Sequence, residues 1–90
     1  MKRLHIFIDG KVQGVFYRAT MQQMARSLQL KGWIRNLPTG KVEALLEGDE
    51  KRLDEIIDWC WKGPPRAFVK NVTWIEETHQ GEYSDCSILY

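Results

Sequence analysis

A glycine-centred loop next to an arginine is the part of this 90-residue chain best suited to chemistry. The loop reads Lys11-Val12-Gln13-Gly14-Val15-Phe16-Tyr17-Arg18. It follows a strand-like run and opens a helix-like run, so main-chain N–H groups at the helix start lack carbonyl partners and can bind an anion. Gly14 lets the loop turn closely around a ligand. Arg18 lies about one helical turn into the helix, where its planar guanidinium suits phosphate or carboxylate oxygens. The loop therefore predicts a site for a phosphoryl group.

The loop also has a plainer interpretation. Strand-to-helix turns with one glycine are common, and an arginine early in a helix is often only solvated. Neither Gly10 nor Gly14 is followed by the lysine and hydroxyl pair of G-x-x-x-x-G-K-[ST], and no G-x-G-x-x-G occurs. The loop residues alone leave both interpretations open.

Hydrophobic spacing predicts the elements on either side of the loop. Leu4, Ile6 and Ile8 alternate with their neighbours in the two-residue period of a half-buried strand, which ends between Gly10 and Val12. From about Phe16 to Leu28 the apolar residues follow helical spacing instead; they are Tyr17, Met21, Met24, Ala25 and Leu28. The loop is thus expected to connect a strand to a helix.

The rest of the chain predicts a hairpin, a second helix and two strands. Residues 32–36 and 41–47 are extended runs joined by the turn sequence Leu37-Pro38-Thr39-Gly40. Asp49 can cap a second helix, which ends at Gly63-Pro64-Pro65 and whose apolar stripe is Leu53, Ile56, Ile57 and Cys60. Residues 68–77 read as a strand, 79–85 as a polar loop and 86–90 as a short last strand.

This order predicts an α+β fold. It is the ferredoxin-like β-α-β-β-α-β sandwich, with two helices on one face of a mostly antiparallel sheet and an extra short C-terminal strand. We expect one domain over residues 1–90, with no linker or repeat. In this topology the first loop and the hairpin can face the same edge of the sheet, which brings Asn36 toward the loop. An Asn beside a Leu-Pro turn also commonly serves the turn itself.

Composition sets limits on partners and location. Lys and Arg total 13 against 12 Asp and Glu, and a net charge of +1 gives no general attraction to nucleic acid or to an anionic membrane. No apolar run is long enough for a signal peptide or a membrane span. Cys60 and Cys86 match no metal spacing and are most simply reduced thiols, although a disulfide between them remains an alternative. His5 and His79 have no ligand-spaced neighbours, so no metal site is predicted. We expect a cytoplasmic monomer.

Two stretches resemble the signatures of the acylphosphatase family. The first signature, G-x-V-Q-G-V-x-[FM]-R, is similar to Gly10-Lys11-Val12-Gln13-Gly14-Val15-Phe16-Tyr17-Arg18. The second, G-[FYW]-x-x-N-x-x-x-G-x-V with a further glycine six residues on, resembles Gly32-Trp33-Ile34-Arg35-Asn36-Leu37-Pro38-Thr39-Gly40-Lys41-Val42, with Gly48 in place. The resemblance extends over the whole chain. Three departures are Tyr17 where Phe or Met is usual, Thr39 where Asp is common, and the last strand, Cys86 to Tyr90.

The resemblance implies an enzyme that hydrolyses acyl phosphates to a carboxylate and inorganic phosphate, without metal or cofactor. Arg18 and Asn36 are the implied catalytic residues. The phosphoryl group would be held by Arg18 together with the main-chain N–H groups of the loop, namely those of Gln13, Gly14, Val15, Phe16, Tyr17 and Arg18. Asn36 would direct a water at phosphorus. Inorganic phosphate should act as product and competitor.

Two other classes of function fit the same fold. An RNA-recognition module would need stacking aromatic residues on the two central strands, and residues 41–47 contain none. A regulatory module could retain the anion site without turnover, but the presence of Asn36 argues against it.

Overall fold

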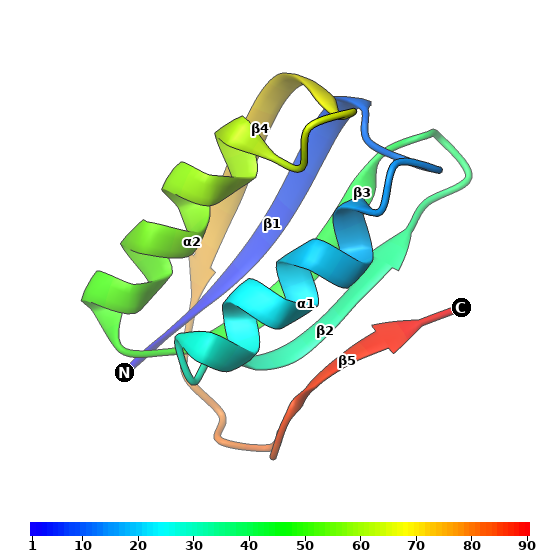
Figure 1. Cartoon of the computed structure of the whole chain (residues 1–90). Helices are drawn as coiled ribbons and strands as arrows, with labels where there is room; N and C mark the ends of the chain where they lie inside the picture. Colours follow the sequence, from blue (N-terminus) through cyan, green and yellow to red (C-terminus); the bar gives the residue numbers. More distant parts are fainter.

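A computed structural model describes all residues, 1–90, as two helices packed on one face of a five-stranded sheet (Figure 1). The elements are β1 (Lys2–Lys11), α1 (Tyr17–Ser27), β2 (Lys31–Asn36), β3 (Val42–Gly48), α2 (Glu50–Lys62), β4 (Phe68–Glu77) and β5 (Cys86–Leu89). The strand order is β4-β1-β3-β2-β5, antiparallel throughout except for the parallel pair β2 and β5. The predicted ferredoxin-like α+β fold with an added C-terminal strand is confirmed.

The core lies between the sheet and the helices. Leu4, Ile6 and Ile8 on β1 are buried, as their alternation predicted. The apolar stripes of both helices meet this face; their buried members are Tyr17, Met21 and Ala25 on α1, and Leu53, Ile56, Ile57 and Cys60 on α2. Burial of these stripes holds both helices on the sheet and fixes the end of β1 next to the start of α1.

The bulge near the end of β1 directs the chain into the loop. The pairing of β1 with β4 shifts register between Asp9 and Gly10. Gly10 has φ 129°, and a Cβ at this position would lie 2.2 Å from the main-chain oxygen of Phe68. Only glycine permits this close approach of the two strands. The bulge therefore bends β1 just before the loop.

Both ends of α2 are capped by side chains. The Asp49 carboxylate accepts a hydrogen bond from the main-chain N–H of Lys51 at 3.1 Å, which confirms the predicted N-cap. At the other end Pro64 and Pro65 have no N–H to donate to the carbonyl of Cys60. The Tyr17 hydroxyl donates to that oxygen at 2.7 Å instead. A side chain from α1 thus completes the C-terminus of α2.

The two cysteines are free thiols, buried in the core. Burial raises the pKa of Cys60 to about 12 and that of Cys86 to about 11. Both thiols are therefore neutral near pH 7, and a neutral thiol is a poor nucleophile.

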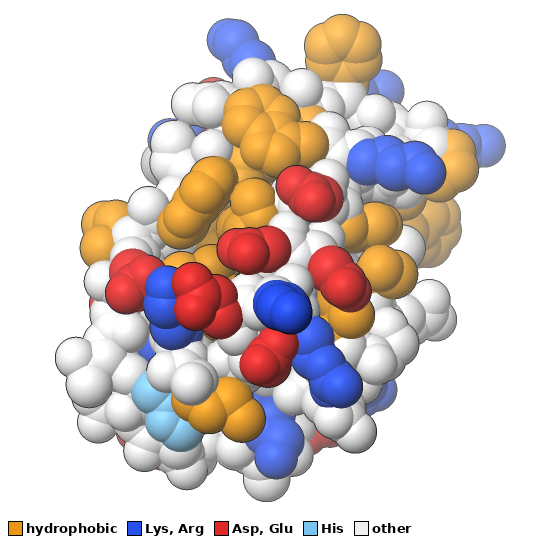
Figure 2. Space-filling view, turned by 90° about the vertical axis from the view of Figure 1, so that its left-hand side faces the viewer, with side chains coloured by type: hydrophobic (Ala, Val, Ile, Leu, Met, Phe, Trp, Pro, Cys, Tyr) orange, Lys and Arg blue, Asp and Glu red, His pale blue; other side chains and the backbone are white.

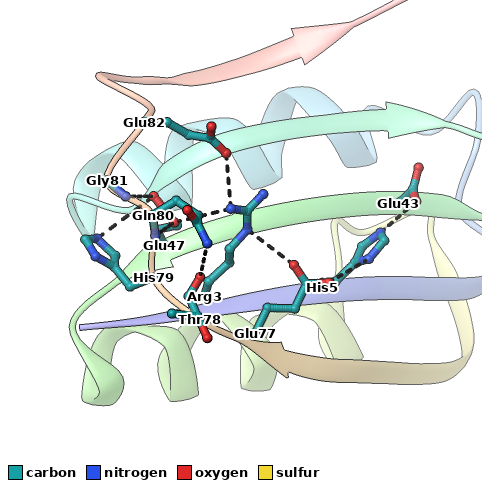
Figure 3. A network of polar contacts seen from close by, with 10 residues as sticks. All are labelled: Arg3, His5, Glu43, Glu47, Glu77, Thr78, His79, Gln80, Gly81 and Glu82. Atoms are coloured by element: carbon teal, nitrogen blue, oxygen red, sulfur yellow. Dashed lines mark hydrogen bonds and ion pairs between the residues drawn. The ribbon is translucent and has the colours of Figure 1, made fainter.

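The sheet face opposite the helices carries a network of charged side chains (Figure 3). Glu47 on β3 is 3% exposed and accepts hydrogen bonds from the main-chain N–H groups of Gln80, at 2.7 Å, and Gly81, at 3.2 Å. Arg3 on β1 lies 3.8 Å from Glu47 and donates to Glu82 at 3.1 Å. These contacts attach the loop between β4 and β5 to the sheet.

A second buried carboxylate, that of Glu43, lies near the start of β3. Burial alone would raise the pKa of Glu43, but hydrogen bonds to His5, at 2.7 Å, and to Arg35 lower the pKa below its ordinary value. The His5 ring contacts those of Phe7 and Trp33, with centroids 4.7 and 6.2 Å away. Phe7 on β1 and Trp33 on β2 thus lie on either side of β3, with the His5 ring in contact with both.

Charges of both signs are mixed on the side of the molecule that carries α2 (Figure 2). The exposed charged residues of this helix include Glu50, Lys51, Arg52, Asp54, Glu55 and Asp58. Neither helix of the protein is long and apolar enough to cross a membrane.

Candidate functional site

A small cavity lies where the loop after β1 meets the ends of β2 and β5. Figure 1 shows this loop and the turn between β2 and β3 projecting at the same end of the sheet. The cavity has a volume of 260 Å³ and is lined by Val12, Gly14, Phe16, Tyr17, Arg18, Ala19, Asn36, Ile88 and Tyr90. The structure thus brings both predicted catalytic residues, Arg18 and Asn36, to one cavity.

The loop presents main-chain donors that have no partner in the protein. The N–H groups of Gln13, Gly14, Val15 and Phe16 donate to no main-chain or side-chain acceptor, and Tyr17 and Arg18 open α1, where N–H groups have no intrahelical partner. Gly14 has φ 74°, a left-handed conformation that favours glycine. Unpaired N–H groups at a helix N-terminus carry partial positive charge. Such a loop can bind an anion.

Side chains beneath the loop hold it on the core. Val12 and Val15 are buried, and Tyr17 is 1% exposed with its ring 5.1 Å from that of Trp59. The Tyr17 side chain therefore points away from the loop surface, and this residue can contribute only its main chain to an anion. Its hydroxyl donates to the main-chain oxygen of Cys60, away from the loop.

The Gln13 side chain joins the loop to the hairpin. Its amide nitrogen donates to the main-chain oxygens of Leu37, at 2.8 Å, and Lys41, at 2.9 Å. These oxygens lie at the two ends of the turn, which is closed by a hydrogen bond from Leu37 N to Lys41 O. The sequence predicted only that the main-chain N–H of Gln13 binds the phosphoryl group. The side-chain contacts reach 24 and 28 residues ahead, and only the fold brings these residues together.

Arg18 has a guanidinium that forms no ion pair with any carboxylate of the protein. Its Cζ lies 5.0 Å from the centre of the Tyr90 ring, and both residues line the cavity. A cation–π contact of this kind leaves the N–H groups of the guanidinium free to donate. The arrangement leaves Arg18 able to donate to an anion in the loop.

Asn36 is the last residue of β2 and projects into the same cavity. Its Oδ1 atom is buried and accepts no hydrogen bond. A buried unpaired acceptor costs ~1 to 3 kcal/mol, so such atoms are uncommon away from functional sites. The Asn36 oxygen is therefore free to accept a hydrogen bond from a group bound in the cavity.

A larger cavity of 790 Å³ lies at the opposite end of β2. Its lining includes two groups of paired charges: Arg26 donates to Asp85 at 2.8 and 3.1 Å, and Glu47 accepts from two N–H groups. Among the lining side chains, the arginine that could bind an anion is thus already held by a carboxylate, unlike Arg18 in the smaller cavity. No group of three or more His, Cys, Asp or Glu residues could hold a metal ion.

The fold is a ferredoxin-like α+β sandwich, and its first loop offers free N–H groups in a cavity that also contains an arginine and an asparagine. These features define a class of small anion-binding proteins. Comparison with known proteins gives the family. The family model for acylphosphatase matches residues 4–88. The acylphosphatase of Syntrophus aciditrophicus is 48% identical over 90 residues, covering 100% of this chain and 94% of that protein.

Solved structures agree with the sequence comparison. The crystal structure of acylphosphatase from Bacillus subtilis superposes with a TM-score of 0.96 at 33% identity and covers 100% of both chains. An acylphosphatase structure from Coxiella burnetii gives a TM-score of 0.93 at 40% identity, covering 98% of this chain and 92% of that one. The chain belongs to the acylphosphatase family and is an enzyme that hydrolyses acyl phosphates.

Proposed function

We propose that the main-chain N–H groups of residues 13–18 and the guanidinium of Arg18 bind the phosphoryl oxygens of the acyl phosphate. The unpaired N–H groups from Gln13 to Phe16 and the free guanidinium support this assignment. Negative charge on the phosphoryl oxygens would be stabilised by donors already in place before the reaction. Preorganised donors of this kind are a large source of rate acceleration.

We propose further that Asn36 positions the attacking water. The observation that carries the proposal is that the Asn36 amide oxygen is buried without a partner in the cavity that also contains Arg18. The water oxygen bonds to phosphorus while the bond from phosphorus to the acyl oxygen breaks. The carboxylate leaves with the electron pair, and the water's proton is released with inorganic phosphate.

This reaction needs no strong base and, we propose, no metal. A carboxylate is a good leaving group, and phosphoryl transfer passes through a loose transition state with charge spread over the oxygens. Positioning of the water and stabilisation of that charge can then supply most of the rate. Inorganic phosphate should compete for the same loop.

We also propose that the chain acts as a single-domain monomer in the cytoplasm, without a nucleic-acid or membrane partner. The mixed charges of the α2 side and the net charge of +1 argue against a nucleic-acid or anionic membrane partner. An RNA-binding role for the open sheet face is disfavoured because β3, which lies between β1 and β2, has no aromatic residue and carries Glu43 and Glu47 on this face. Light scattering after size exclusion should give 10.6 kDa.

The test is hydrolysis of benzoyl phosphate, followed by loss of ultraviolet absorbance in the presence of EDTA. The unsubstituted protein is compared with Asn36→Ala, and phosphate binding is measured for both. We expect metal-free turnover that falls by ~10²-fold or more in the variant, with phosphate affinity nearly unchanged.

Three results would count against parts of the proposal. Turnover that requires an added metal would exclude the metal-free mechanism. Equal loss of turnover and of phosphate affinity in Asn36→Ala would exclude the water-positioning role. Phosphate binding without any turnover would instead point to a regulatory anion-binding module.

A further inference from the structure

Phe16 occupies an unfavourable position for an aromatic residue. It is the N-cap of α1, with φ 63° and ψ 22°, and its side chain makes no capping hydrogen bond. Left-handed backbone is uncommon for bulky residues, and N-caps favour Ser, Thr, Asp, Asn or Gly. The side chain is also 75% exposed. Neither helix capping nor core burial explains a phenylalanine here.

The backbone of Phe16 is held without help from its ring. Its main-chain oxygen accepts from Thr20 twice, from N at 3.0 Å and from Oγ1 at 2.8 Å. The ring is outside the hydrophobic core and lines the cavity. Strained, exposed aromatic residues at a site are often retained for contact with a ligand.

Two residues at the end of the chain add apolar surface to the cavity. Ile88 on β5 and Tyr90 both line it, and the Tyr90 ring stacks on Arg18. The cavity lining therefore combines polar groups, from Gly14, Arg18 and Asn36, with apolar or aromatic side chains, from Phe16, Ile88 and Tyr90. A phosphoryl group needs only the polar groups.

In-line attack by a water at Asn36 would point the acyl group toward the exposed aromatic residues of the cavity lining. In phosphoryl transfer the attacking and leaving oxygens lie roughly in line on opposite sides of phosphorus. The Asn36 oxygen is buried, whereas Phe16 and Tyr90 are exposed at the open side of the cavity. If water comes from Asn36, the carboxylate leaves toward the two rings.

We infer that Phe16 and Tyr90 form the acyl-binding surface of this enzyme and select acyl phosphates whose acyl group is aromatic or otherwise bulky and apolar. This inference rests on the proposed placement of the phosphoryl group in the loop. Stacking and apolar contact with the rings would stabilise such an acyl group, whereas an acetyl group offers too little surface to reach them.

The experiment compares benzoyl phosphate with acetyl phosphate for the full-length protein and its variants. The quantity measured is the ratio of kcat/KM for the two substrates, so any uniform effect of a substitution on the loop cancels. Phe16→Ala and Phe16→Asn remove the ring, and Asn tolerates the left-handed backbone. Phe68→Ala is the matched control, because Phe68 is also 75% exposed but does not line the cavity.

We expect the ratio to fall ~3- to 10-fold in both Phe16 variants, as for loss of an aromatic contact, and to stay unchanged in Phe68→Ala. Tyr90→Ala should lower the ratio in the same direction and also reduce activity on both substrates, since it removes the ring that stacks on Arg18. A ratio unchanged in both Phe16 variants would overturn the inference while leaving the proposed function intact. Failure of the unsubstituted protein to hydrolyse either substrate would overturn both.

Discussion

The side-chain amide of Gln13 donates a 2.8 Å hydrogen bond to the main-chain oxygen of Leu37, the residue that follows Asn36. The Gln13 side chain thus links the loop after β1, where we propose that phosphate binds, to the end of β2, where we propose that Asn36 binds the water. We expect Gln13→Glu to lower kcat ~10-fold or more, because a carboxylate cannot donate to two carbonyl oxygens and a small displacement of Asn36 is costly. Phosphate affinity should change less than kcat. Steady-state kinetics with phosphate as inhibitor measures both.

Two variants show whether Gln13 acts through Asn36. In an Asn36→Ala background, Gln13→Glu should cause no further loss of turnover, since the group it positions is gone. Gln22 is the matched control, because its amide donates to the oxygen of Cys86 at 2.9 Å in a similar bond. Gln22→Glu should lower stability with little effect on kcat. Additive losses in the double variant would contradict the positioning role.

Arg18 is expected to contribute through its geometry as well as its charge. Arg18→Ala should reduce kcat/KM by ~10²- to 10³-fold and weaken phosphate inhibition, since no other side chain in the cavity supplies paired donors. Arg18→Lys should recover only part of this loss, because an ammonium group lacks the planar pair of donors. Arg52→Ala on α2 controls for loss of one positive charge. Near-normal activity of Arg18→Ala would show that the anion site lies elsewhere.

The parts of this structure that sequence could predict are those determined by short-range patterns. Alternation at Leu4, Ile6 and Ile8 and capping by Asp49 depend on neighbours within a few residues, and both are confirmed. Side-chain contacts of Gln13 and Tyr17 depend on partners 24 to 43 residues away, and their sequence spacing carries no signal of them. The family resemblance indicated Arg18 and Asn36 as site residues. That the Asn36 oxygen is buried without a partner is visible only in the structure.

The Tyr17 hydroxyl should matter for stability and not for catalysis. Tyr17→Phe leaves the Cys60 oxygen without a donor, since Pro64 and Pro65 cannot replace it. We expect the free energy of unfolding to fall by ~1 to 3 kcal/mol, the usual cost of an unpaired buried group. Urea denaturation measures the change, with Tyr83→Phe as a control at a less buried tyrosine. A large loss of kcat in folded Tyr17→Phe would instead indicate a role in the reaction.

Stability should decline in alkaline solution because of the buried thiols. Unfolded cysteines titrate near the ordinary pKa of 9.0, whereas burial raises the pKa of Cys60 to about 12 and that of Cys86 to about 11. Between pH 9 and pH 11 the unfolded chain therefore binds fewer protons than the folded one, so the free energy of unfolding falls as pH rises. The contribution approaches ~1.4 kcal/mol per pH unit for each thiol.

Urea denaturation at a series of pH values from about 8 to 11 tests this alkaline loss. Cys60→Ala should flatten the dependence by removing one titrating thiol. Val72→Ala, which shortens another buried side chain, should lower stability by a similar amount at every pH and keep the original slope. The Tyr17 hydroxyl, whose pKa burial also raises, adds to the loss above about pH 10, so the interval just above pH 9 is the most informative. An unchanged slope in Cys60→Ala would mean that the buried thiol does not govern alkaline unfolding.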